Sequence, residues 1–167
     1  AGGSPKASGF DWLKRLGHSI AQPVPSLFTF NMPGESVKEM MGLVVPDALV
    51  RIQGTKLSHQ GPVLITHWGM SGPAVLKLSA WGARELQARG YAFNIQINWI
   101  GIANESEVLD IIEASLPENR KKKISNACPF DLPKNFWLYV LNKSQVNAEM
   151  PWPVSYTHLT LPTIVDV

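Results

Sequence analysis

The hydrophobic pattern is densest near the middle of the chain, where Pro62 to Trp68 forms a short apolar run between two glycines. A run of this length is typical of a strand buried on both faces. The following Gly69 to Pro73 permits a tight turn and a helix start, because proline loses no hydrogen bond at the first helical position. The next apolar stripe has helical spacing, at Val75, Leu78, Gly82 and Leu86. We therefore expect a strand, a glycine turn and a central helix that ends near Gly90.

Strict alternation of apolar and polar residues marks the segment Ala92 to Ile100, the clearest period-two pattern in the sequence. Its apolar positions are Phe93, Ile95, Ile97 and Trp99. This pattern predicts a strand with one buried and one solvated face. Further short strands are expected at Leu27–Phe30, Leu49–Gln53, after a Pro46-Asp47 turn, and Lys56–His59.

The last third of the sequence changes to helical patterns. Asn104 with Glu107 three residues later resembles a capping box, and Pro117 would follow the end of that helix. Pro133 can begin another helix with an apolar face. A short amphipathic segment, Phe10 to Leu16, precedes the strands. Strands followed by a cluster of helices predict an α+β fold.

Composition and charge exclude several classes of protein. The chain of 167 residues has 45% hydrophobic residues and a net charge of +2, which gives no argument for a nucleic-acid or membrane partner. The basic run Arg120 to Lys123 is most simply a solvated helix face. The single cysteine, Cys128, excludes an internal disulfide, and no apolar run approaches the ~20 residues that a bilayer requires. We expect a cytoplasmic protein.

The central turn is the best candidate site because it gathers a hydroxyl, an imidazole and backbone donors near a helix start. His67 and Ser71 are the candidate catalytic residues, and Thr66, Gly69 and Gly72 would form the turn that presents them to a ligand. Two structural alternatives stay open. His67 can be a core histidine bonded to backbone, and Ser71 can be a helix cap.

Other chemistries lack their motifs. A nucleophile elbow needs Gly-x-Ser-x-Gly, but Pro73 stands at its last position, and the only histidine downstream of Ser71 is His158. The sequence has no Gly-x-Gly-x-x-Gly, and its histidines and Cys128 lack metal-ligand spacing. We therefore assign no metal and no dinucleotide-binding fingerprint to this chain.

The C-terminal segment Val154 to Val167 resembles the in-frame translation of an adapter used in sequencing-library preparation. We therefore leave it out of functional reasoning. We expect few tertiary contacts beyond Trp152 and unchanged stability when the segment is deleted. A natural tail prone to β structure is the alternative.

The central motif also carries a family resemblance. Leu64 to Leu76 reads Leu-Ile-Thr-His-Trp-Gly-Met-Ser-Gly-Pro-Ala-Val-Leu, and Gly17-His18 and Val24 to Leu27 precede it in matching order. With these motifs the chain resembles the aminoacetone-oxidase-like family of FAD-dependent NAD(P)H oxidoreductases. The resemblance runs from Ala1 to about Trp152.

The resemblance implies an architecture in which an insert divides an FAD-binding Rossmann-type domain. The insert would be a partly open, incomplete antiparallel β-barrel with a central helix and a small helical subdomain. Residues 1–25 would be a remnant of the FAD-binding domain with a linker, 26–100 the barrel, 101–152 the helical subdomain and 153–167 a non-native tail. Gly2 and Gly3 match a flavin-contacting segment of the family, although Ala1 stands where threonine is usual. The resemblance also implies that the turn of Thr66, Gly69 and Gly72 faces the substrate or the flavin.

The resemblance implies that this chain is a fragment of an FAD-dependent oxidoreductase. The parent enzyme would use FAD, NAD(P)H and a small-molecule substrate, and the fragment would need the missing Rossmann-type halves for activity and for retaining FAD. At least one of the strands 49–53, 62–68 and 92–100 would then keep an unpaired edge and favour self-association. The alternative is a free-standing ligand- or protein-binding module without catalysis.

Overall fold

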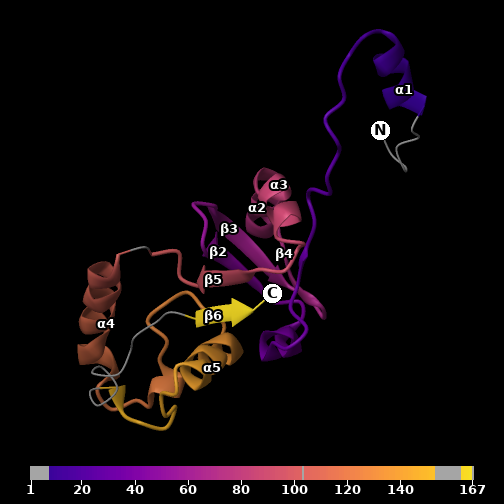
Figure 1. Cartoon of the computed structure of the whole chain (residues 1–167). Helices are drawn as coiled ribbons and strands as arrows, with labels where there is room; N and C mark the ends of the chain where they lie inside the picture. The colour runs from indigo at the N-terminus through magenta and orange to yellow at the C-terminus, as the bar shows by residue number, and fades with distance from the viewer. Residues whose placement is uncertain (1–7, 103, 153–162, 167) are drawn as a thin grey trace.

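The computed structural model describes residues 8–102, 104–152 and 163–166, and it has the expected α+β architecture. An antiparallel sheet curls into a partly open barrel, with its strands in the order β1-β4-β3-β2-β5-β6 (Figure 1). The strands are β1 (Phe30–Asn31), β2 (Val44–Ile52), β3 (Ser58–Ile65), β4 (Gly69–Ser71), β5 (Asn94–Asn98) and β6 (Thr163–Asp166).

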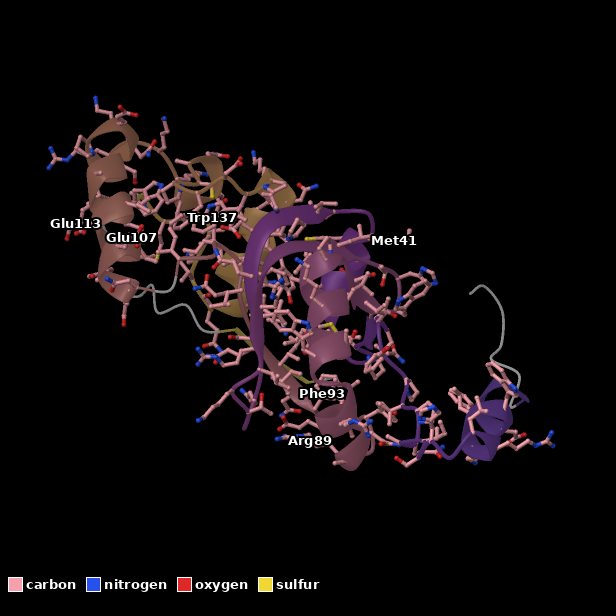
Figure 2. The ribbon with its side chains drawn as sticks, turned by 90° about the horizontal axis from the view of Figure 1, so that it is seen from above. Met41, Arg89, Phe93, Glu107, Glu113 and Trp137 are labelled. Atoms are coloured by element: carbon pink, nitrogen blue, oxygen red, sulfur yellow. The ribbon has the colours of Figure 1, made fainter. Side chains whose placement is uncertain are left out.

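The described residues also form α-helices (labelled α) and short 3-10 helices (labelled η). They are α1 (Ser8–Arg15), η1 (Ser36–Met40), α2 (Pro73–Trp81), α3 (Ala83–Ala88), α4 (Glu105–Asn119), η2 (Ile124–Asn126) and α5 (Lys134–Lys143). Figure 2 shows α4, with Glu107 and Glu113, at one end of the molecule and α1 standing off at the other. None of the described helices is long and apolar enough to cross a membrane.

The central stretch folds differently from the expectation of one strand, a turn and one helix. Strand β3 starts at Ser58 and ends at Ile65, so it joins two segments that were expected as separate strands. The chain then turns back through β4, whose Met70 pairs with Ile65, before Gly72 leads into α2. The expected single strand to Trp68 is wrong because this segment forms a hairpin. In the C-terminal half of β3, buried side chains alternate with more exposed ones, so the strand is not buried on both faces.

The central helix is divided at Gly82. Helix α2 ends at Trp81 and α3 begins at Ala83. A Cβ at Gly82 would lie 2.9 Å from Leu57 Cδ1, so a larger residue would press into the sheet. Gly90, with φ of +65°, ends α3 as expected from the sequence.

Strand β2 also differs from its prediction. Pro46 and Asp47 were expected in a turn before a strand at Leu49, but β2 runs through them as a nine-residue strand. The register with β3 shifts between Val45 and Ala48. Because proline cannot donate to the ladder, the strand bulges there and continues.

Residues 104–152 form the helical region, which contains α4, η2 and α5. It begins and packs largely as the sequence indicates. The Asn104 side chain accepts a hydrogen bond from Ser106 N at 3.1 Å, so Asn104 is the N-cap of α4. Pro117 lies in the last turn of α4, not beyond its end. Two buried indoles stabilise the turns, with Trp137 Nε1 donating to Ile124 O at 2.7 Å and Trp152 Nε1 to Ala127 O at 2.8 Å.

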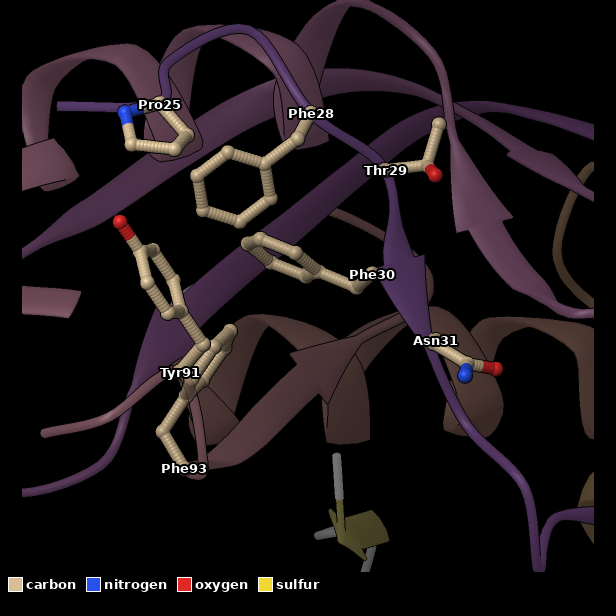
Figure 3. A pocket seen from close by; sticks show the side chains of 7 residues that line it. All are labelled: Pro25, Phe28, Thr29, Phe30, Asn31, Tyr91 and Phe93. Carbon is tan, nitrogen blue, oxygen red and sulfur yellow. The ribbon is translucent and has the colours of Figure 1, made fainter. Parts of the chain in front are cut away.

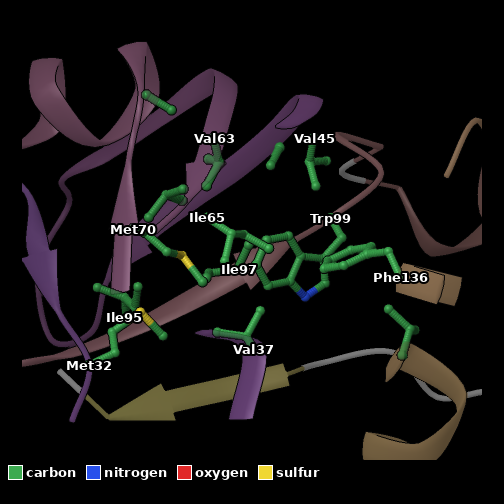
Figure 4. Close-up of a cluster of buried hydrophobic side chains, with 14 of the residues drawn as sticks. Met32, Val37, Val45, Val63, Ile65, Met70, Ile95, Ile97, Trp99 and Phe136 are labelled. Carbon is green, nitrogen blue, oxygen red and sulfur yellow. The ribbon is translucent and has the colours of Figure 1, made fainter. Parts of the chain in front are cut away.

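The core is continuous between the sheet and the helical region. The apolar positions of the 92–100 alternation are all buried, which confirms that prediction. Trp99 meets Phe136 of α5 edge to face, with ring centroids 4.8 Å apart. Figure 4 shows both rings next to Val37 and the side chains of the inner sheet face.

The sheet also includes part of the C-terminal segment. Strand β6 pairs antiparallel with Asn94 to Ile97 of β5, so the expectation of few tertiary contacts beyond Trp152 is wrong; residues 153–162 lie outside the described residues. Strands β2 and β5 therefore have partners on both sides. Strand β3 pairs with β4 only through Leu64 and Ile65, and β1 is an end strand of the sheet among the described residues.

Candidate functional site

The hairpin between β3 and β4 contains most of the residues that the sequence singled out. Thr66 N donates to Gly69 O at 2.8 Å, and Gly69 N donates to Thr66 O at 3.3 Å and to Thr66 Oγ1 at 3.2 Å. These bonds close a two-residue loop made of His67 and Trp68. The turn is therefore built by Thr66 and Gly69, as expected, but it joins two strands and not a strand and a helix.

His67 lies on the surface at the tip of this hairpin. Its side chain is exposed, and its ring contacts Trp68 with centroids 4.1 Å apart. No hydrogen bond to the His67 imidazole is formed among the described residues. The alternative of a buried core histidine is therefore wrong, and both ring nitrogens are available to a ligand.

Ser71 occupies a different environment. It is half-buried in β4 and pairs with Leu64 in the ladder. It does not cap α2, because the N-cap residue is Gly72 and no side chain bonds to the first turn. No hydrogen bond joins Ser71 to His67 in the described structure, so the two candidates belong to one hairpin without forming a catalytic pair.

The two glycines of the motif are required by close backbone packing. A Cβ on Gly69 would lie 2.2 Å from the carbonyl oxygen of Phe30 in β1. On Gly72, which has a φ of +100°, a Cβ would lie 2.7 Å from the carbonyl oxygen of Pro62. Part of the motif is thus explained by folding alone.

Two of the expected flavin-contacting residues, Gly2 and Gly3, lie outside the described residues. Among the residues that the structure describes, no three histidine, cysteine, aspartate or glutamate side chains gather to hold a metal ion.

The sequence did not predict the cavity beside β1. A cavity of about 290 Å³ lies beside β1 and is lined by Pro25, Phe28, Thr29, Phe30, Asn31, Tyr91 and Phe93 (Figure 3). The only signal in the sequence is that aromatic residues alternate at 28 and 30 and again at 91 and 93. Nothing in the sequence pattern indicates that these two segments meet.

A second cavity, of about 300 Å³, lies between the sheet and the helical region. Trp99, Ile111 and Phe130 contribute apolar walls, and Asp47 and Asp131 are exposed at its surface. Asp47 accepts a hydrogen bond from Gln60 Nε2 at 2.9 Å. The second cavity thus lies between the sheet and the helical region, and its described lining residues do not form a catalytic cluster.

Two ionisable side chains near this region have raised pKa values. Burial raises the pKa of Tyr139 to about 12, and the Glu35 carboxylate adds to the effect. Ser36 opposes this shift, but the Tyr139 hydroxyl has no well-formed hydrogen bond. Burial likewise raises the pKa of the Cys128 thiol, which makes this cysteine a poor nucleophile at neutral pH.

Comparison with known families places this fold. The family model described as HI0933-like protein barrel and H2TH domain matches residues 24–165. The match covers β1 to β5, α2 to α5 and β6 up to Val165, and it leaves out α1. It therefore includes much of the segment that resembles an adapter. No curated protein matches the chain.

Proposed function

Because the chain belongs to the HI0933-like barrel and H2TH domain family, which is linked to FAD-dependent oxidoreductases, we propose that it is the barrel and helical part of such an enzyme. The observation that carries the proposal is the family match over residues 24–165, together with a partly open barrel followed by helices. In this proposal the parent protein takes electrons from NAD(P)H and acts on a small molecule.

The size of the two cavities described above supports the proposal that FAD is held outside this chain. Both described cavities, of about 290 and 300 Å³, are at the lower end of the size range of small-molecule sites, and FAD is a large dinucleotide. The first turn of α2 begins with proline, which removes one of the backbone donors that a pyrophosphate would use. We therefore propose that FAD is held mainly by Rossmann-type parts of the parent, and that this chain alone is inactive.

The hairpin is the part of this chain best suited to contact a substrate or nicotinamide in the parent. His67 offers an exposed imidazole without a described hydrogen-bond partner, next to a Trp68 ring that is 42% exposed. We propose that His67 and Ser71 orient the ligand by hydrogen bonding and not by covalent chemistry. Thr66, Gly69 and Gly72 then serve to shape the loop.

The test uses the full-length parent with His67→Asn or Ser71→Ala. Losing one hydrogen bond at the transition state costs about 1–3 kcal/mol, so turnover with NAD(P)H should slow about ten- to a hundred-fold while the protein stays folded and yellow. The matched control is His59→Asn, because His59 lies at the other end of β3 against Trp81. Turnover at the parental rate in both hairpin variants would show that the motif is only structural.

A free-standing binding module is the second candidate. The observation that favours it is the aromatic cavity beside β1, which is built entirely from this chain. This candidate requires that the chain bind a ligand without any flavin domain.

A further inference from the structure

The aromatic cavity lies where β1, an end strand of the curled sheet, approaches the segment that leads into β5. The rings of Phe30 and Phe93 meet edge to face with centroids 5.0 Å apart, and those of Phe28 and Tyr91 do so at 5.8 Å. Figure 3 shows these four rings on one side of β1, with Pro25 at the rim. The cavity of about 290 Å³ is open to solvent.

The lining of the cavity favours a flat, uncharged ligand. Its side chains include no lysine, arginine, histidine, aspartate or glutamate. Moving a charged group into such surroundings would cost its hydration without any compensating partner. Aromatic walls instead favour another aromatic ring, which can stack or pack edge to face.

The rim of the cavity offers unpaired backbone groups. Met32 N donates to Trp68 O at 2.8 Å, and Phe30 pairs with Met70, so these residues direct their backbone groups toward β4. In an antiparallel ladder the intervening Asn31 directs its N–H and C=O groups to the opposite side. No strand occupies that side among the described residues. An amide group on the ligand would find donor and acceptor partners there.

Strained backbone on both flanks of the cavity is a second, independent observation. Leu27 and Tyr91 have φ values of 56° and 61°, and they are two of the three described non-glycine residues with positive φ. A left-handed conformation costs such residues about 1–2 kcal/mol, and strain of this kind clusters at binding sites. Tyr91 directly follows Gly90 at the end of α3, where its N–H bonds to Leu86 O at 2.9 Å. The left-handed turn after α3 places the Tyr91 ring in the lining of the cavity.

We propose that this cavity binds a small, uncharged aromatic ring that carries an amide group. The ring lies among Phe28, Phe30 and Tyr91, and the amide pairs with the free backbone edge of β1. The site is independent of FAD and of the hairpin, so its test and the turnover test of the hairpin can fail separately.

The experiment is a titration of the 167-residue chain with benzamide, followed by saturation-transfer NMR. We expect saturable binding in the millimolar range, and binding of cyclohexanecarboxamide that is about three- to tenfold weaker because it lacks the aromatic face. Tyr91→Gly should weaken benzamide binding by a similar factor. Glycine accepts the positive φ without strain, so this variant should stay folded.

Two further variants complete the test. Phe28→Leu retains apolar volume but removes a ring, so it should weaken benzamide binding even if Tyr91→Gly were to unfold. Trp81→Ala removes an aromatic side chain that is 71% exposed on α2 and does not line the cavity, and it should bind as the wild type does. The proposal is overturned if the wild type shows no saturable binding, if the folded cavity variants bind equally well, or if cyclohexanecarboxamide binds with equal affinity.

Discussion

The tightest backbone contact of the hairpin lies between Gly69 and β1. Because a Cβ on Gly69 would lie 2.2 Å from Phe30 O and 2.9 Å from Met32 N, the two strands can approach each other only with glycine at this position. The sequence showed that Gly69 permits a turn, but the steric reason depends on a strand about 40 residues earlier in the chain. A short motif can therefore be fixed by packing that no local pattern indicates.

Gly69→Ala should lower the free energy of unfolding by at least about 2 kcal/mol, because the clash with backbone cannot be relieved by a side-chain rotation. Gly34→Ala is the matched control, since a Cβ there meets nothing within 4 Å. Urea unfolding of both variants measures the difference. Equal stability of the two variants would contradict the close approach of β4 and β1.

Tyr139 provides a pH-dependent prediction. Its pKa is raised from 10.0 to about 12 by burial and by Glu35, so above pH 10 the native state keeps a proton that the unfolded state has released. This contribution is complete below the unfolded-state pKa and is lost as the pH rises through the native-state value. Tyr139→Phe removes a buried hydroxyl without a well-formed bond, so it should change stability by less than about 1 kcal/mol at pH 7.

Urea unfolding at pH 7 and at about pH 11 separates the two effects. The wild type should lose more stability between these pH values than Tyr139→Phe does, because only the wild type releases this proton on unfolding. An identical loss in both proteins would show that the Tyr139 phenol is solvated in the native state.

At the scale of elements, periodic patterns predicted the structure where one face of an element is buried. The alternation around Ile95 and the N-cap at Asn104 are local signals, and both appear in the structure. The expected capping box is not formed among the described residues, because Asn104 accepts from Ser106 N and no hydrogen bond joins Glu107 to it. The hairpin and the β2 bulge were missed because Thr66 to Trp68 and Pro46-Asp47 are compatible with several backbone paths. The aromatic cavity was missed because it depends on a contact between segments about 60 residues apart.

The pairing of β6 with β5 leads to a prediction that opposes the one from the adapter resemblance. Deleting residues 163–167 removes a four-residue ladder and exposes the edge of β5. The melting temperature should fall by about 3 °C or more, with increased self-association on size exclusion. The full-length chain is the control. An unchanged melting temperature would show that the segment adds nothing to the fold, as the resemblance implies.

At the scale of the whole molecule, the described residues share a continuous core, and neither of the two cavities described above has the volume of a dinucleotide site. The family match accounts for both features if the barrel and helices form one part of a larger flavoprotein. The free edge of β1 and the exposed hairpin would then be surfaces that meet the rest of the protein or its ligands.

The most direct test of this account is the visible absorbance spectrum of the full-length protein whose reading frame contains this chain. We predict that it purifies with the absorption bands of bound FAD, that NADPH or NADH bleaches them without oxygen, and that the 167-residue chain keeps no flavin after desalting. A full-length protein that is colourless and does not take up FAD would contradict the account, as would retention of FAD by the chain alone.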